Sequence, residues 1–381
     1  MKVLHVTPYF YEAWAYGGIP RLSYHLAAAQ AALGHEVHAV TTDARDRNSR
    51  RTGGDYQVSG ISVRVHPNLS NLLAYHYQLF WPRGLATEAG RVGDCDVIHI
   101  HGHRNLLNTR MAEYARRAGK PIVLQPNGTL VNIERRRAAK NFYDALWGRD
   151  QVRRTTAFVA VSHVERDQFL KLGLAPGTIR VIPNGVEMDT RVDNRSFKHE
   201  FKISGEYVLY LGKITPRKGI EHAIAALPLF DDQGIKLVVA GNDMGFERGL
   251  RRRAERLGVA DRVVFTGLVT GAMKALAYRE ALFTVYAGRD EIFGLVPWES
   301  ILCGTPVIVA DDSGCGEWVK AGQAGHLVPY GDPAAIARVI NTRGRERDQA
   351  MVQQGIAFCR ERLDWGRIAA DMIEYYREFA R

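Results

Sequence analysis

The regular alternation of short apolar runs with helical patterns is the feature of this 381-residue chain that most limits its possible folds. Such alternation is typical of parallel sheets assembled from β-α-β units. A first series of expected strands occupies residues 2–7, 36–41, 61–66, 96–101, 121–126, 157–162 and 179–184. A second series begins afresh and occupies residues 207–212, 235–241, 262–267, 282–287, 306–311 and 325–329.

A polar segment at residues 187–206 separates the two series, and the chain is long enough for two domains of ordinary size. The sequence therefore predicts two Rossmann-like α/β domains with doubly wound sheets, over residues 1–190 and 191–363. Residues 364–381 predict an amphipathic helix, which we expect to return to the first domain. Ligands of open α/β folds bind at the carboxyl ends of the strands, where the motifs below are expected to lie.

Composition excludes several classes of protein. No run of about 18 apolar residues occurs, and the start "MKVLHVTPYF" does not resemble a secretory signal, so a cytoplasmic location is expected. The four cysteines are scattered without CxxC spacing, which is typical of a reducing compartment. They are Cys95, Cys303, Cys315 and Cys359.

The chain is basic, with 51 Lys and Arg against 41 Asp and Glu and a net charge of +10. Clusters at residues 45–51, 134–140 and 248–256 could form a solvated face, contact an anionic membrane surface or bind nucleic acid. Residues 248–256 are expected to be a plain charged helix face. The segment "NFYDALWGRDQVRR" after the second cluster carries Phe142, Tyr143, Leu146 and Trp147. These residues could rest on a membrane interface, but packing into the core is the favoured interpretation.

The stretch "DEIFGLVPWES" at residues 290–300 holds two glutamates around a predicted helix start. Pro297 suits a first helical turn, so Glu299 is expected on the helix and Glu291 in the loop before it. The backbone amides of Phe293, Gly294 and Leu295 then point out of the helix start and attract an anion. Carboxylates accept hydrogen bonds from hydroxyls but repel phosphate, so the pattern suits a ligand with both groups, such as a nucleotide sugar.

Lys213 and Lys218 flank a short turn before Gly219 and could clamp a diphosphate, whose negative charge grows as it leaves. Two solvated lysines are the alternative, but cations near a helix start are unfavourable, which favours function. The glycine-rich turn at residues 312–317 matches neither GxGxxG nor the P-loop pattern and is expected to be structural.

In the first domain, Gly17 and Gly18 follow the first strand and allow backbone to approach a ligand. His99, His101 and His103 share one strand face if that strand continues. We expect no metal site, because no second group of metal-ligating residues accompanies them, and we expect a polar role for His101 and core packing for His99. Ser162 beside His163 lacks the surroundings of a serine nucleophile.

Across essentially its whole length, the chain resembles the family 4 retaining glycosyltransferases of the GT-B fold. The resemblance rests on the order of the segments "GG", "LGHEV", "DVIHIHG", "VAVSHVERDQFLKLGL", "IRVIPNGV", "LGKITPRKGI", "VFTGLV", "DEIFGLVPWES", "CGTPVIVADDSG" and "GHLVPYGDP". It implies a hexose transfer from a nucleoside diphosphate sugar to a saccharide or lipid-linked acceptor, in polysaccharide or glycolipid synthesis. It further implies retention at the anomeric carbon, no metal or other cofactor, and a phosphate oxygen that takes the acceptor proton.

The same resemblance assigns site residues. Glu291 contacts hydroxyls of the transferred sugar, and Glu299 holds the nucleotide ribose. The diphosphate is bound by Lys213, Lys218, the amides of Phe293, Gly294 and Leu295, and Gly18 across a cleft between the domains. Gly267, Leu268 and Val269 lie beside the base. We predict catalytic roles for Glu291, His101 and Lys218, and acceptor contacts for His101 and Asn127.

Three residues depart from the family pattern. Lys213 replaces a common arginine and loses its two-pronged geometry, Asn127 replaces a histidine, and His163 replaces a glutamate. The alternatives are a nucleotide-sugar epimerase or phosphorylase of the same fold, a non-catalytic sugar-nucleotide binder and, on charge alone, a nucleic-acid binding protein; no nucleic-acid partner is expected. The choice among UDP, GDP and ADP, the sugar and the acceptor stay open, as does a peripheral position at the inner face of the cell membrane.

Overall fold

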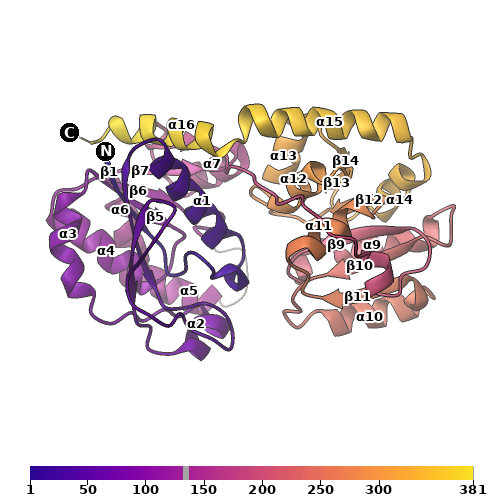
Figure 1. Ribbon diagram of the computed structural model, residues 1–381, viewed down its shortest axis with the longest axis horizontal. Coiled ribbons are helices and arrows are strands. Elements are labelled where there is room, and N and C mark those ends of the chain that lie inside the picture. Colours follow the sequence, from indigo (N-terminus) through magenta and orange to yellow (C-terminus); the bar gives the residue numbers. More distant parts are fainter. Residues whose placement is uncertain (132–136, 381) are drawn as a thin grey trace. The chain divides into compact units, whose positions relative to one another are not determined.

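The computed structural model describes residues 1–131 and 137–380, so residues 134–136 of the second basic cluster lie outside the described part (Figure 1). The chain forms two compact units, one from Met1–Gly185 with the segment that begins at Asp364, the other Val186–Leu363. The boundary falls five residues before the expected one at 190, since the backbone N–H of Val186 donates to Leu363 O (2.8 Å) and ties this segment to the second unit.

The first unit holds an eight-stranded sheet in the order β3-β4-β2-β1-β5-β6-β7-β8. Every neighbouring pair is parallel except β3 and β4. The strands are β1 (Lys2–Val6), β2 (Glu36–Thr42), β3 (Tyr56–Val58), β4 (Ile61–His66), β5 (Val97–His101), β6 (Ile122–Gln125), β7 (Ala157–Ala160) and β8 (Ile179–Val181).

Strand β3 is the one element of this sheet that the apolar pattern did not predict. It forms a hairpin with β4 through Ser59 and Gly60, whose φ angles of 49° and 77° are both left-handed. Two central residues with positive φ are the signature of a tight hairpin turn. The strand is only three residues long and none of its residues is buried, so its apolar pattern is too short to detect.

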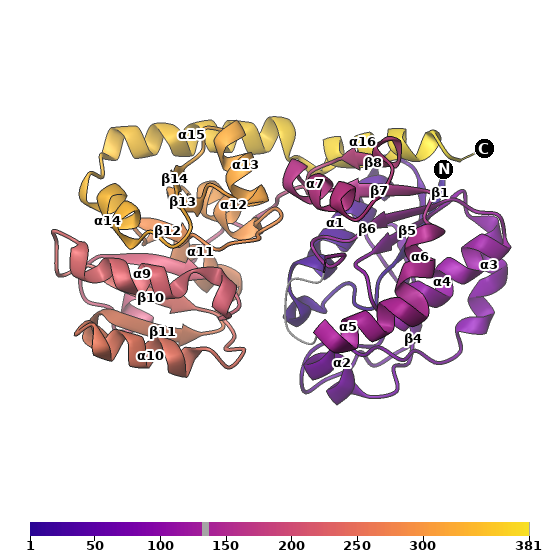
Figure 2. The same ribbon diagram turned by 180° about the vertical axis from the view of Figure 1, so that it is seen from behind.

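Helices cover both faces of the first sheet. They are α1 (Gly18–Ala32), α2 (Asn71–Tyr77), α3 (Glu88–Asp94), α4 (Leu106–Arg117), α5 (Arg137–Tyr143), α6 (Arg149–Arg153), α7 (His163–Lys171) and α16 (Trp365–Arg377). Helix α16 lies beside α1 in both views (Figures 1 and 2). Its apolar stripe, which includes Ile368 and Met372, packs with Val3, Val97 and Val123 of the sheet.

The second unit holds a six-stranded parallel sheet in the order β11-β10-β9-β12-β13-β14. Its strands are β9 (Tyr207–Leu211), β10 (Lys236–Ala240), β11 (Val263–Gly267), β12 (Phe283–Tyr286), β13 (Val307–Ala310) and β14 (His326–Val328). Its helices are α8 (Phe197–Glu200), α9 (Ile220–Ala226), α10 (Glu247–Arg256), α11 (Gly271–Arg279), α12 (Leu295–Leu302), α13 (Gly314–Ala321), α14 (Pro333–Asn341) and α15 (Arg345–Arg362).

Two doubly wound α/β sheets confirm the predicted fold class. In the second unit, β9 pairs with β10 on one side and with β12 on the other, so the strand order reverses at β9. The carboxyl ends of β9 and β12 therefore meet at the position where open α/β sheets bind ligands. In the described residues, no helix has both the length and the apolar character that a membrane crossing requires.

Candidate functional site

The loops that follow β9 and β12 are locked together at this edge of the second sheet. The backbone N–H of Arg289 donates to Arg217 O (3.0 Å). A β-carbon at Gly219 would collide with Ala287 O, and one at Gly288 would come within 2.9 Å of Arg217 O. Because both positions need glycine, the two loops hold Lys218 and Glu291 at a fixed separation.

Glu291 shares its carboxylate between a lysine and a tyrosine. Lys218 Nζ lies 2.5 Å from Glu291 Oε1 and also donates to the hydroxyl of Tyr286 (3.0 Å). That hydroxyl in turn donates to Glu291 Oε2 (2.9 Å). The Lys218 and Glu291 side chains are 18% and 11% exposed, which leaves both within reach of a ligand.

Electrostatics fix the protonation of this group. Burial alone lowers the pKa of Lys218, but attraction to Glu291 outweighs it and the pKa lies above its usual value. Burial, and then the neighbouring Glu291 charge, raises the pKa of Tyr286 well above its usual value. At neutral pH the site therefore contains an ammonium and a neutral phenol, both of which donate to Glu291.

Glu299 has the same kind of surroundings. It rides α12 as predicted, with Lys274 Nζ 2.6 Å from its Oε2 and the Tyr278 hydroxyl donating to that oxygen (2.9 Å). Burial and the Glu299 charge raise the pKa of Tyr278 well above its usual value. Sequence reasoning missed Lys274 and Tyr278, although their spacing of four on a helical pattern placed them on one helix face.

Helix α12 begins at Leu295, so the helix start on which the anion-site prediction rests is present, and the anion site itself stays a prediction. Gly294 precedes the helix with φ 73°, no side chain of the described residues caps it, and Pro297 lies in its first turn. A β-carbon at Gly294 would come within 2.8 Å of Cys315 Sγ. Cys315 also donates its backbone N–H to Glu291 O (3.2 Å), so the glycine-rich turn supports the glutamate loop from behind.

The other predicted donor residues lie at separate positions. Lys213 is exposed after β9, and its carbonyl accepts from the Tyr210 hydroxyl (2.8 Å). Gly267 ends β11, followed by Leu268 at 61% exposure and a buried Val269. Gly18 opens α1 in the first unit. The Val269 side chain belongs to the core of the second unit. The donor-binding roles of these residues stay predictions.

In the first unit, Asn127 has the left-handed φ of 51°, and its Oδ1 accepts from Asn184 Nδ2 (3.1 Å). The loop is anchored by Glu165, which accepts from the backbone N–H groups of Gly128 (2.6 Å) and Val161 (2.8 Å). Burial raises the pKa of Glu165 to about 7. Sequence reasoning missed this residue, although Ser162 and Glu165 show the spacing of a helix capping box.

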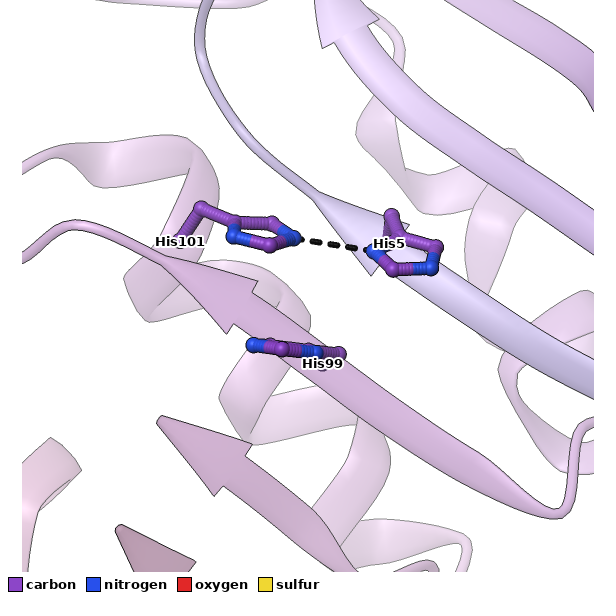
Figure 3. A group of neighbouring side chains, drawn as sticks. All are labelled: His5, His99 and His101. Atoms are coloured by element: carbon purple, nitrogen blue, oxygen red, sulfur yellow. Dashed lines mark hydrogen bonds between the residues drawn. The ribbon is translucent and has the colours of Figure 1, made fainter. Parts of the chain in front are cut away.

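His101 lies in a buried histidine cluster that the sequence did not predict (Figure 3). The expectation that nothing complements His99 and His101 is wrong, because β1 pairs with β5 and places His5 beside His99. His103 does not continue the row, since β5 ends at His101 and Gly102 turns the chain with φ 74°.

Hydrogen bonds hold this cluster. His5 Nδ1 lies 2.9 Å from His101 Nε2 (Figure 3), and His5 Nε2 lies 2.8 Å from Gln30 Oε1. His99 Nδ1 is hydrogen-bonded to the Tyr376 hydroxyl of α16. Burial lowers the pKa of His5 to about 4 and those of His99 and His101 well below their usual value, so all three are neutral.

Ring geometry favours a hydrogen-bond network over a metal site, and the absence of a metal stays a prediction. The His99 and His101 rings stack with centroids 4.2 Å apart and planes 19° apart, and His5 lies at 12° to His101. A metal ion lies in the plane of each imidazole that binds it, so stacked rings do not converge on one ion. His101 is also fully buried, and the catalytic and acceptor roles predicted for it stay predictions.

Two family models match the chain. Residues 16–190 match "Glycosyltransferase Family 4", and residues 192–355 match "Glycosyl transferases group 1". A D-inositol 3-phosphate glycosyltransferase of Acidothermus cellulolyticus is 30% identical over 92% of this chain and 84% of its own length. A phosphatidyl-myo-inositol mannosyltransferase of Mycobacterium leprae is 34% identical over 52% of this chain and 53% of its own.

Solved structures share the fold over the whole chain. HepE of Anabaena in complex with UDP and glucose superimposes with a TM-score of 0.73 at 18% identity, covering 99% of this chain and 100% of that one. The sucrose-phosphate synthase of Thermosynechococcus elongatus gives a TM-score of 0.70 at 19% identity, with 99% of each chain covered. These likenesses establish the GT-B fold.

Proposed function

Since the chain belongs to glycosyltransferase family 4 of the group 1 glycosyl transferases, we propose that it transfers a hexose from a nucleoside diphosphate sugar with retention at the anomeric carbon. The observation that carries this proposal is the pair of glutamates at one helix start, each joined to its own lysine and tyrosine. Carboxylates bind sugar and ribose hydroxyls, and the lysines supply the positive charge that a diphosphate needs.

The arrangement of the second unit supports the following mode of donor binding. The diphosphate lies against the uncapped start of α12 and takes charge-assisted hydrogen bonds from Lys218 and Lys213. Glu299 binds the ribose and Glu291 the sugar hydroxyls. As the glycosidic bond to phosphate breaks, the ammonium groups stabilise the growing charge of the leaving diphosphate.

Retention and metal independence are part of the proposal. The departing phosphate oxygen takes the proton of the acceptor hydroxyl. The acceptor oxygen then bonds to the anomeric carbon from the face that the phosphate leaves. Glu291 serves as a hydrogen-bond acceptor, because its carboxylate is held by Lys218 and Tyr286. The two lysines supply the charge that a divalent cation supplies elsewhere, so turnover in EDTA should equal turnover without it.

The comparisons suggest where to look for substrates. HepE was solved with UDP and glucose, which makes UDP-glucose the first donor to try. The names of two relatives contain an inositol phosphate and a phosphatidylinositol, so we propose a polyol phosphate, a saccharide or a lipid-linked sugar as the acceptor.

Exposed apolar side chains on the first unit support contact with the cytoplasmic face of a membrane. Packing of the segment around residue 142 into the core was expected, but Phe142 is 66%, Leu146 49% and Trp147 41% exposed. Leu72 of α2 is 61% exposed. Aromatic and basic residues together bind anionic lipid surfaces.

A thermal-shift screen against UDP, GDP, ADP and their sugar conjugates tests the proposal. A ligand bound only by the folded state raises its melting temperature. We expect one nucleotide family to stabilise the protein and Glu299→Ala to abolish the shift. No shift with any of them contradicts the proposed donor site, and release of epimerised sugar without an acceptor indicates an epimerase instead.

A further inference from the structure

Three groups at the sugar-binding glutamate form a closed triangle of hydrogen bonds. Lys218 Nζ contacts both Glu291 Oε1 (2.5 Å) and the Tyr286 hydroxyl (3.0 Å). The same hydroxyl donates to Glu291 Oε2 (2.9 Å). The cation proposed to hold the diphosphate is therefore already paired, and the carboxylate proposed to hold the sugar already accepts one hydrogen bond at each oxygen.

This pairing competes with ligand binding, and exchange of one bond removes the competition. An ammonium has three donors, of which Glu291 and Tyr286 take two. A diphosphate that approaches Lys218 also meets the negative charge of Glu291, since that carboxylate lies against the same nitrogen. A neutral sugar hydroxyl that bonds to Glu291 Oε1 must share this oxygen with the Lys218 ammonium unless the lysine moves away.

We propose that donor binding moves Lys218 from Glu291 Oε1 to a diphosphate oxygen, and that Tyr286 is the positioning residue that keeps Glu291 aimed at the sugar during this exchange. The move frees Oε1 for a sugar hydroxyl while the phenol retains Oε2. Glu291 thus acts as an internal anion that the donor's phosphate replaces. This inference rests on the donor site of the proposed function.

The surroundings of Tyr286 suit a fixed support. Its side chain is 6% exposed and lies parallel to the Tyr210 ring, with centroids 6.4 Å and planes 9° apart. A β-carbon at Gly294 would come within 3.3 Å of the Tyr286 ring. Tyr210 is itself held, because its hydroxyl donates to Lys213 O (2.8 Å). The phenol is therefore confined, whereas the lysine has a flexible four-carbon stem.

Calorimetric titration with UDP, and with GDP and ADP in parallel, tests the exchange in the full-length chain. Glu291→Gln should bind the preferred nucleoside diphosphate about tenfold more tightly than the unchanged protein, because Lys218 is released and a like charge is removed. The same variant should lose turnover of the corresponding nucleotide sugar. A gain in affinity together with a loss of activity is the result that the exchange requires.

Tyr286→Phe tests the positioning role. We expect its affinity for the nucleoside diphosphate to stay within about twofold, its KM to change little and its kcat for donor hydrolysis to fall about tenfold, the scale of one hydrogen bond to a charged group. Tyr278→Phe is the matched control, because it removes the corresponding phenol from Glu299. It should weaken nucleotide binding, which Tyr286→Phe leaves intact.

Other outcomes overturn the inference. If Glu291→Gln binds nucleoside diphosphates no more tightly than the unchanged protein, Lys218 is not exchanged. If Tyr286→Phe lowers the melting temperature, nucleotide affinity and kcat together, the phenol has only a structural role. If the unchanged protein binds none of the three nucleoside diphosphates, the proposed function fails as well, and the two failures are thereby distinguished.

Discussion

The side chains buried at the carboxyl ends of the two sheets differ in charge: they are neutral in the first unit and charged in the second. At β1 and β5 the first unit holds three neutral histidines, joined to Gln30 and Tyr376 by hydrogen bonds. At β9 and β12 the second unit holds charged residues, with the Lys218 and Lys274 ammonium groups against Glu291 and Glu299. Both arrangements sit below loops that open α/β folds use for ligands.

The difference indicates how the work is divided. A neutral hydrogen-bonded network is cheap to bury and has no charge to offer a ligand, so it fixes strands and the returning helix α16. An ion pair that is partly buried costs desolvation, but its members can change partners when a phosphate or a hydroxyl arrives. The proposed donor site therefore lies where charged groups, and not neutral ones, are available to a ligand.

The largest effect is expected from breaking one of these ion pairs. Lys274→Met leaves the buried Glu299 carboxylate without its cation and should lower the free energy of unfolding by about 3 kcal/mol. Replacing both partners, as Lys274→Met with Glu299→Leu, should restore most of that loss because no uncompensated charge remains. Urea denaturation of the three proteins measures this. A double variant as unstable as the single one would contradict the ion-pair account.

Acid should loosen the first unit before the second. The folded pKa of His5 is about 4 and those of His99 and His101 are also lowered, so below pH 6.5 the unfolded chain binds protons that the folded chain does not. Stability then falls with decreasing pH, by about 1.4 kcal/mol per pH unit for each histidine. Glu165 works in the opposite direction between pH 4.5 and 7, because its raised pKa favours the protonated folded state.

Hydrogen exchange between pH 7 and pH 5, corrected for its intrinsic pH dependence, can follow this difference. Amides of β5 and α16 should lose protection as the pH falls, while those of α12 should keep theirs. Earlier loss of protection in α12 would reverse the assignment of neutral and charged regions.

A smaller effect is expected from the phenol that joins α16 to the histidines. Tyr376→Phe leaves His99 Nδ1 buried without this partner and should cost about 1–3 kcal/mol of unfolding free energy with donor turnover unchanged. Tyr375→Phe is the matched control, since its hydroxyl donates to the carbonyl of Thr178 (3.0 Å). Equal losses of unfolding free energy in both variants would show that the contact with His99 stabilises the fold no more than an ordinary buried hydrogen bond does.

The smallest effect on stability is expected outside both regions. Phe142→Ser and Leu72→Ser alter exposed side chains and should change the unfolding free energy by less than about 0.5 kcal/mol. Each should weaken binding to phosphatidylserine vesicles, measured by sedimentation, by at least about tenfold, because about 1.5–3 kcal/mol of apolar burial is lost. Leu229→Ser, at an exposed leucine of the second unit, is the control. Unchanged vesicle binding would contradict the membrane proposal.

Local patterns explain what the sequence could predict. All strands except β3 follow from the hydrophobic period. The helix that carries Glu299 and the loop that carries Glu291 follow from proline placement and a recognisable motif within 11 residues. Lys218 could also be predicted as a site residue, because it belongs to a local sequence motif. These features depend on neighbours along the chain, and the structure has them at the predicted positions.

Contacts between distant segments were beyond sequence reasoning. His5 lies beside His99 only because β1 and β5 are neighbours in the sheet, and the partner of His99 on α16 is 277 residues away. Likewise, the helical pattern shows Lys274 and Tyr278 on one face but not that Glu299 lies opposite. The exposure of Phe142 was mispredicted because an amphipathic pattern does not reveal which surface covers it.

Nuclear magnetic resonance of donor hydrolysis tests the central claim most directly. With UDP-glucose and no acceptor, the protein should release first the anomer present in the donor, and Lys218→Met should slow this release by about a hundredfold, since the cation facing the leaving diphosphate is lost. Arg217→Met, at the adjacent cation, should remain close to the unchanged rate. Release of the opposite anomer first, or an undiminished rate in Lys218→Met, would contradict a retaining site built on the paired charges of the second unit.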